Sequence, residues 1–390
     1  MKVLWVGDAV CSSGFARSTH AVCDYIHSRG CEVNILGINY RGDPHPYPYD
    51  IYTAFPGGDL FGMNRIVWMC DACSPDVIII QQDPWHYPGY MHQLAKVPEY
   101  KKLPVIGFVA VDGLNCRGRD LNGLAMAIFW TQFGEEQARL GGYVGPSAVV
   151  PLGVNTTIYT PGDKREAREK LGLPARLRDA YIVGNINRNQ IRKRLDLTVR
   201  YFARWWKELG SPRDVFLFLH VAPSGENAFD LKQLAAYYEM LPQMILAEPP
   251  IWCGVEEPRM CETYRAFDVQ ISTTQGEGDG LTTKEGMACC IPQIVPQWSA
   301  LGEWAVGAAH LVPCTTVATT LIVNSIGGVA DETLFVDALH RVHAIEEYRQ
   351  TLARKGYDCM HQDKYRWETV GRDFFGHLES VMATPMEQTA

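Results

Sequence analysis

Hydrophobic positions in the first half of the chain fall into short unbroken runs separated by amphipathic segments. Such runs, typical of strands buried on both faces, occur at 2–8, 31–38, 75–81, 104–111, 127–133 and 148–154. Segment 16–29 instead places its apolar residues on one helical face, and Gly30 ends it. Continuous apolar strands that alternate with helices indicate a parallel sheet covered on both faces.

The second half repeats the same scheme. Strands are expected at 180–186, 215–221, 244–249, 269–273 and 292–296, and helices at 195–209, 230–241, 332–345 and about 362–382. The turn-rich segment 151–163 and a charged helix at 163–171 lie between the halves. We therefore predict two doubly wound, Rossmann-like domains, 1–155 and 156–364, facing each other across a cleft. Ligands of such sheets bind at the carboxyl ends of the strands.

Composition narrows the class of protein. The 390 residues are 47% hydrophobic and 21% charged, with a net charge of −8, which disfavours a broad cationic face for gripping nucleic acid. The twelve cysteines form no regular framework, and the lone Cys70/Cys73 pair lacks a second pair at zinc-site spacing. We expect reduced, mostly buried cysteines in a cytoplasmic protein, without a signal peptide or a membrane span.

The stretch GEGDGLTTKE, residues 276–285, carries the most specific chemistry. Glu277 and Glu285 lie eight positions apart, with glycines before and between them. Glycines let the backbone approach a ligand, and carboxylates bind ribose hydroxyls or face a developing positive charge. A solvated loop that leads into an ordinary helix is the plainer interpretation of the stretch taken alone.

Several stretches together resemble one family, the retaining GT-B glycosyltransferases of family 4, with a virus-type member as one option. The resemblance is carried by PLGVNTTIYTP (151–161), the block 263–303, GNINRNQIRKRLD (184–196), YRWETVGRDFFGHL (365–378) and VIGFVAVDG (105–113). It implies the GT-B fold, with 365–390 crossing back to the first domain. The first domain then binds the acceptor, and the second binds a nucleotide-sugar donor.

The resemblance assigns Glu277 to the transferred sugar and Glu285 to the nucleotide ribose. The loop and helix start expected at the diphosphate are Gly278, Gly280, Leu281, Thr282 and Thr283. Two departures put the identity of the sugar in doubt. Asp279 stands where the family usually has an aromatic or apolar residue, and Thr282 replaces a common proline.

Arg188 and Lys193 match the spacing of the family's diphosphate-binding cations. Two cations there stabilise the negative charge that builds as the glycosidic bond breaks. Arg194 departs from the usual glycine, and the roles of Arg192 and Arg194 stay open. A solvated helix start, or a phosphate-binding patch for nucleic acid, is the alternative for this basic segment.

The remaining candidates rest on position. Asp112 follows a buried strand beside a glycine, and we expect it to place the acceptor or the sugar rather than only to bond its own backbone. Gly14, in a strand-to-helix turn, is expected near the donor, with a plain tight turn as the alternative. Trp252 is expected beside the nucleotide base. An aromatic loop with Asp83, Trp85 and His86 is expected to shape the acceptor pocket, and a simple surface histidine is the alternative for His86.

The sequence thus predicts a retaining glycosyltransferase that moves a hexose or pentose from a nucleotide-diphosphate sugar to an acceptor hydroxyl. The catalytic candidates are Glu277, Asp112, Arg188 and Lys193. The acceptor is either a glycan or lipid, or a hydroxymethylated pyrimidine in DNA, whose base would have to leave the stack. No cofactor and no metal are expected, because no convincing Asp-x-Asp is present. A non-catalytic nucleotide-sugar or nucleic-acid binding protein with a degenerate GT-B site is the alternative.

Overall fold

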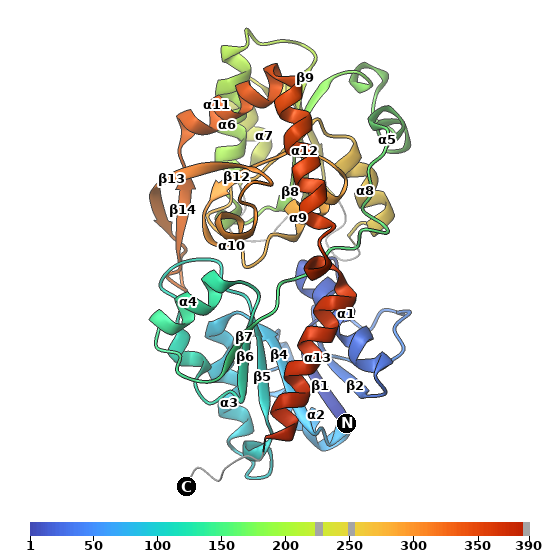
Figure 1. The fold of residues 1–390 in the computed structure, drawn as a ribbon, viewed down its shortest axis with the longest axis vertical. Coiled ribbons are helices and arrows are strands. Elements are labelled where there is room, and N and C mark those ends of the chain that lie inside the picture. Colours follow the sequence, from blue (N-terminus) through green and yellow to red (C-terminus); the bar gives the residue numbers. More distant parts are fainter. Residues whose placement is uncertain (223–228, 249–253, 385–390) are drawn as a thin grey trace. The chain divides into compact units, whose positions relative to one another are not determined.

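The computed structural model describes residues 1–222, 229–248 and 254–384 (Figure 1). The chain divides into two compact units. The first contains Met1–Val111, Asn115–Gly153 and the chain from Lys364 onward. The second contains Val154–Asp363. The short segment Asp112–Leu114 also belongs to the second unit, although the residues before and after it in the sequence belong to the first.

The first unit is a seven-stranded parallel sheet with the order β3-β2-β1-β4-β5-β6-β7. Its strands are β1 Lys2–Asp8, β2 Glu32–Ile38, β3 Asp50–Thr53, β4 Val77–Gln82, β5 Val105–Val109, β6 Met126–Phe129 and β7 Ser147–Val149. Its α-helices are α1 Gly14–Ser28, α2 Arg65–Cys73, α3 Tyr87–Leu94, α4 Gln132–Leu140 and α13 Trp367–Ala383.

Both faces of this sheet are covered, as the unbroken apolar runs require. Leu4 and Val6 of β1 belong to a core shared with α2 and α3. Trp5, which points to the opposite face, lies 5.7 Å from the ring of Phe374 on α13. The C-terminal helix α13 packs beside α1 on that face, and this return to the first unit was expected (Figure 1).

The second unit is also a seven-stranded sheet, with the order β10-β9-β8-β11-β12-β13-β14. Its strands are β8 Tyr181–Arg188, β9 Val215–Ala222, β10 Met244–Ala247, β11 Val269–Ile271, β12 Gln293–Gln297, β13 His310–Thr319 and β14 Ile326–Ala330. All neighbours pair in parallel except β14, which forms an antiparallel hairpin with β13.

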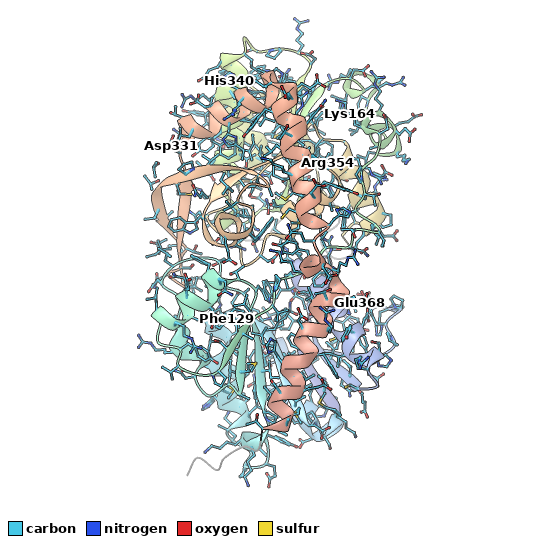
Figure 2. All side chains as sticks on the ribbon, in the orientation of Figure 1. Phe129, Lys164, Asp331, His340, Arg354 and Glu368 are labelled. Carbon is cyan, nitrogen blue, oxygen red and sulfur yellow. The ribbon has the colours of Figure 1, made fainter. Side chains whose placement is uncertain are left out.

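Helices again cover this sheet. They are α5 Lys164–Lys170, α6 Leu195–Glu208, α7 Leu231–Tyr237, α8 Glu257–Arg265, α9 Leu281–Ala288, α10 Ser299–Trp304, α11 Glu332–Ala344 and α12 Glu346–Met360. Figure 2 marks Asp331, whose carboxylate caps α11 by accepting from the Leu334 N–H at 3.0 Å. Such caps fix where helices begin.

The structure corrects several boundaries. The apolar run 127–133 is a strand only to Phe129, because Thr131 caps α4 by accepting from the Gly134 N–H at 3.0 Å. The run 148–154 ends as a strand at Val149. The short edge strand β3, the helix α12 and the hairpin strand β14 had no distinct hydrophobic signal and were not expected.

Candidate functional site

Three neighbouring strands of the second unit end beside one another and supply the candidate site. In the sheet order, β11 lies between β8 and β12. The segments that follow their carboxyl ends are 189–194, 272–280 and 298–304. Because parallel strands end at one edge, the basic segment after β8 and the acidic loop after β11 are brought together, as the sequence predicted.

Four charged side chains form a compact cluster at this edge. Lys193 Nζ lies 2.5 Å from Glu277 Oε1, and Arg192 Nη1 lies 3.6 Å from Glu277 Oε2. Arg192 Nε also lies 3.0 Å from Asp112 Oδ2. Three of the four catalytic candidates, Glu277, Asp112 and Lys193, therefore meet, and Arg192 is the side chain that joins them.

Burial shapes the ionisation of this cluster. The pKa of Lys193 falls from 10.5 to about 8, first because burial disfavours the ammonium, an effect that Glu277 partly opposes. Burial alone would raise the pKa of Glu277, but Lys193 and Arg192 outweigh it and hold the pKa below its usual value. The Glu277 carboxylate is thus ionised at neutral pH, whereas the Lys193 ammonium loses its proton at a pH slightly above neutral.

The segment Asp112–Leu114 is fixed by the hairpin of the second unit. Leu114 exchanges backbone hydrogen bonds with Ile326 at 2.9 and 3.1 Å. Ser325 Oγ donates to Asp112 Oδ1 at 3.4 Å. The Asp112 carboxylate therefore has two anchors, Ser325 and the Arg192 guanidinium, which set its orientation within the cluster.

Two glycines allow the backbone of the acidic loop to take its path. A Cβ at Gly276 would lie 1.8 Å from the Asp112 carbonyl oxygen, so any larger residue would force the segments apart. Gly280 has φ +97°, in the left-handed region, and its Cβ would meet Leu301 at 2.8 Å. Gly278, which the sequence also singled out, is half-buried.

The N-terminus of α9 directs backbone donors outward from this loop. Thr283 N–H donates to Gly280 O at 2.9 Å, so its hydrogen bond is made within the first turn. Within the part of the chain that the structure describes, the N–H groups of Leu281 and Thr282 have no hydrogen-bond partner. Two backbone donors and the positive end of the helix dipole are therefore available to an anion.

The loop is also held by α10, which the sequence reasoning did not single out. Ser299 Oγ accepts from the Glu277 N–H at 2.9 Å. Trp304 Nε1 donates to the Asp279 carbonyl at 2.7 Å. The sequence signal was the position of SALGEW directly after β12, at the same sheet edge.

Asp279, the residue that departs from the family pattern, is turned into the protein. Its Oδ2 accepts from Lys284 Nζ at 2.6 Å, and both side chains are almost fully buried. The negative charge of Asp279, which put the identity of the sugar in doubt, is thus balanced by the Lys284 ammonium inside the protein. Lys284 was not recognised from the sequence, because an i, i+5 acid–base pair has no motif of its own.

Glu285 lies in the second turn of α9 and is 2% exposed. Its Oε2 accepts from the Tyr264 hydroxyl at 2.6 Å, and Tyr264 belongs to α8. The hydroxyl orients the carboxylate and stabilises its charged form. Tyr264 is a second residue of this region that the sequence reasoning missed.

Arg194 stands where the family that the sequence resembles usually has glycine. Its φ of 49° and ψ of 47° lie in the left-handed region, where glycine is the natural residue. The guanidinium instead forms a paired contact with Asp196, with Nη2 2.9 Å from Oδ2. Arg194 is therefore occupied at the start of α6.

Within the described residues, the ion pairs of the charge cluster do not include Arg188, and Gly14 belongs to the first unit. Arg188 is the last residue of β8, and its side chain is exposed. Gly14 opens α1 in the first unit, after Ser13, whose hydroxyl caps the helix and donates to Asp8 at 2.6 Å. Trp252 lies outside the described residues.

The three acceptor candidates lie in the first unit, directly after β4. Asp83 precedes a short 3-10 helix that contains Trp85 and His86. The ring of His86 lies 4.2 Å from that of Phe61, and burial lowers its pKa. His86 is therefore neutral near pH 7.

Cys70 and Cys73 contribute to the first unit's core from α2, and burial raises the pKa of each thiol. Among residues 1–222, 229–248 and 254–384, no group of three or more His, Cys, Asp or Glu side chains is arranged to hold a metal ion. Over the same residues, no helix combines the length and apolarity needed to cross a membrane.

Comparison with known proteins places this geometry in context. No family model matches the chain. A D-inositol 3-phosphate glycosyltransferase of Acidothermus cellulolyticus is 34% identical over 157 residues, 39% of this chain and 33% of that protein. A D-inositol 3-phosphate glycosyltransferase of Stackebrandtia nassauensis is 31% identical over 238 residues, which are 58% of this chain and 47% of that protein. The matches thus span a third to about half the length of these relatives.

Solved structures match over nearly the whole chain. Sucrose-phosphate synthase from Thermosynechococcus elongatus has a TM-score of 0.76 at 16% identity, covering 98% of this chain and 99% of that one. HepE of Anabaena in complex with UDP-glucose has a TM-score of 0.72 at 14% identity, covering 97% and 100%. The chain therefore has the GT-B fold of glycosyltransferases, built from two Rossmann-like α/β units with the C-terminal helix returned to the first.

Proposed function

We propose that the protein is a retaining glycosyltransferase that transfers a sugar from a nucleotide-diphosphate sugar to an acceptor hydroxyl. The observation that carries the proposal is the cluster of Lys193, Glu277, Arg192 and Asp112 at the carboxyl edge of β8 and β11, in which Glu277 is buried and the other three are half-buried. It lies in the same loop system as the α9 N-terminus, whose Leu281 and Thr282 N–H groups suit a diphosphate. Cations and backbone donors in one place favour an anionic leaving group.

The chemistry assigned to these residues is electrostatic. The acceptor oxygen bonds to the anomeric carbon while the bond from that carbon to the phosphate oxygen breaks. The leaving diphosphate takes the acceptor's proton on the same face, so no separate base is needed. Lys193, with Arg188 at the end of β8, stabilises the growing charge on the diphosphate. Glu277 and Asp112 face the sugar.

Glu285 is assigned to the nucleotide ribose, with Tyr264 holding its carboxylate. This assignment rests on its place in α9, eight residues after Glu277. Gly14, at the start of α1, and Trp252 remain proposed donor contacts. Metal independence is part of the proposal, and turnover in EDTA tests it.

The donor base and sugar are best tested first with UDP-glucose, which HepE binds in its solved complex. The relatives are named for D-inositol 3-phosphate, so a phosphorylated polyol joins the glycan, lipid and hydroxymethylated pyrimidine as acceptor classes. Asp83, Trp85 and His86, after β4, are the proposed acceptor contacts.

The deciding experiment incubates the protein with a panel of nucleotide sugars and these four acceptor classes, one of them hydroxymethylcytosine DNA, and identifies products by mass spectrometry. We expect one donor and acceptor pair to give a product heavier by one sugar residue, and an anomeric configuration equal to that of the donor. A folded protein that binds a nucleotide sugar but never releases nucleoside diphosphate supports the degenerate binding protein instead. Steeply salt-dependent DNA binding without donor binding supports a nucleic-acid module.

A further inference from the structure

Asp279 and Lys284 form the most buried ion pair of the candidate site. Lys284 Nζ lies 2.6 Å from Asp279 Oδ2, and the side chains are 0% and 1% exposed. Taking two charges out of water is expensive, and apolar residues of similar size would stabilise the fold at least as well. Stability alone therefore does not explain why this chain carries the pair.

Trp304 ties the pair to α10. Lys284 Nζ lies 5.1 Å from the centre of the Trp304 ring, within the range of a cation–π interaction. The indole N–H of Trp304 donates to the Asp279 carbonyl at 2.7 Å. Asp279 is thus held through its side chain by Lys284 and through its backbone by Trp304.

The other end of the same loop is held by the same helix. Ser299, at the start of α10, accepts from the Glu277 N–H at 2.9 Å. Ser299 has φ 46°, a left-handed conformation that is costly for serine and is retained where the surroundings require it. The short loop 277–280 is therefore fixed at both ends against α10, and α9 begins directly after it.

We propose that Asp279 and Lys284 are positioning residues that set the path of loop 277–280. Through that loop they hold the Glu277 carboxylate against Lys193 and aim the free N–H groups of Leu281 and Thr282. An ion pair suits this task because any loop conformation that separates it leaves an unpaired buried charge. The inference rests on the proposed function, since it names which residues make that site rigid.

Asp279 is therefore not a ligand of the sugar. Its carboxylate is engaged by Lys284 inside the protein and does not contact the transferred sugar. The departure at Asp279 is thus compensated by a second residue, Lys284, five positions on. Sugar specificity must come from other side chains.

The test compares the single variants Asp279→Leu and Lys284→Met with the double variant, using thermal unfolding and nucleotide-sugar turnover. Each single variant leaves one buried charge unpaired, so we expect a melting temperature lower by on the order of 10 °C. The double variant removes both charges and should regain most of that loss. Lys207→Met is the matched control, because Lys207 pairs with Glu239 on the surface at 2.8 Å. It should change neither stability nor turnover noticeably.

Turnover separates a positioning role from a merely structural one. In the stable double variant we expect kcat/KM to fall at least about tenfold, because Glu277 and the α9 donors lose their alignment. The alkaline limb of its pH profile should also move upward, because a looser loop admits water and Lys193 returns toward its usual pKa. A purely structural pair would leave that limb in place.

The outcomes are distinct. The positioning role is overturned if the double variant is as unstable as the single variants. It is also overturned if the double variant has the wild-type kcat/KM and the alkaline limb of its pH profile has not moved. In both cases the proposed function stands. A wild-type protein that turns over no nucleotide sugar overturns the proposed function itself. If the double variant does not fold, Asp279→Asn, which keeps the side-chain volume, takes its place. A native circular dichroism spectrum with lost turnover then supports the proposal, and wild-type turnover overturns it.

Discussion

Replacing Lys193 by arginine gives the sharpest prediction about the charge cluster. The fall in the Lys193 pKa from 10.5 to about 8 corresponds to a free energy of about 3 kcal/mol against the buried ammonium. The free protein should then be about nine-tenths protonated at Lys193 near pH 7 and about one-tenth protonated near pH 9. If the cation stabilises the leaving diphosphate, kcat/KM should fall about tenfold per pH unit above pH 8.

The two kinetic constants should respond differently. Bound diphosphate adds negative charge beside Lys193 and raises its pKa, so the alkaline limb of kcat should lie at higher pH than that of kcat/KM. Lys193→Arg keeps its charge throughout this range, and its kcat/KM should show no limb near pH 8. The assay is chromatographic quantification of released nucleoside diphosphate between pH 6.5 and 9.5, with circular dichroism confirming the fold at each pH.

Stability gives an independent check that needs no substrate. The folded-state pKa of Lys193 lies below its unfolded value, so between about pH 8 and 10.5 the unfolded chain holds the extra proton. The free energy of unfolding of the wild type should therefore rise with pH in that window relative to Lys193→Arg, by up to about 3 kcal/mol. A flat kcat/KM profile to pH 9.5, or an unchanged limb in Lys193→Arg, would refute the reasoning.

Two further predictions concern packing and orientation. Gly276→Ala places a methyl group 1.8 Å from the Asp112 carbonyl oxygen. We expect it to lower the free energy of unfolding, measured in urea, by about 3 kcal/mol or more. The control Gly376→Ala has open space around it and should be neutral or slightly stabilising. A wild-type midpoint for Gly276→Ala would mean that the two segments separate freely. Tyr264→Phe removes the hydroxyl that donates to the Glu285 carboxylate. We expect nucleotide binding, measured by calorimetric titration, to weaken by about 2 kcal/mol with little change in the fold. Unchanged affinity would contradict the assignment of Glu285 to the ribose.

The sequence predicted the fold well where hydrophobic runs were long. Unbroken apolar strands such as 2–8 and 215–221 have few alternatives, and their order of strands and helices implied two doubly wound sheets. The edge strand β3 and the helix α12 were missed because a four-residue strand and a charged, half-exposed helix leave weak periodic signals. Boundaries such as the end of β6 depended on a single cap at Thr131.

The candidate site was predictable in part. The family resemblance assigned Lys193 and Glu277 to one donor site, and the structure brings the two side chains into contact at 2.5 Å. Arg192 was left open, because its two carboxylate partners, Asp112 and Glu277, come from segments far from it in the sequence. The pairing of Asp279 with Lys284 is a matter of side-chain direction inside a helix start, which a linear sequence does not specify.

The most direct test of the central claim is phosphorus NMR of UDP-glucose incubated with the wild-type protein and with Lys193→Met, each with and without the acceptor panel. We predict that the wild type converts UDP-glucose, or another sugar nucleotide tested in the same way, to free nucleoside diphosphate. Lys193→Met should remain folded and release it at least about a hundredfold more slowly, because the leaving group loses its cation. Equal release by the two proteins, or none from any sugar nucleotide by the folded wild type, would contradict the account.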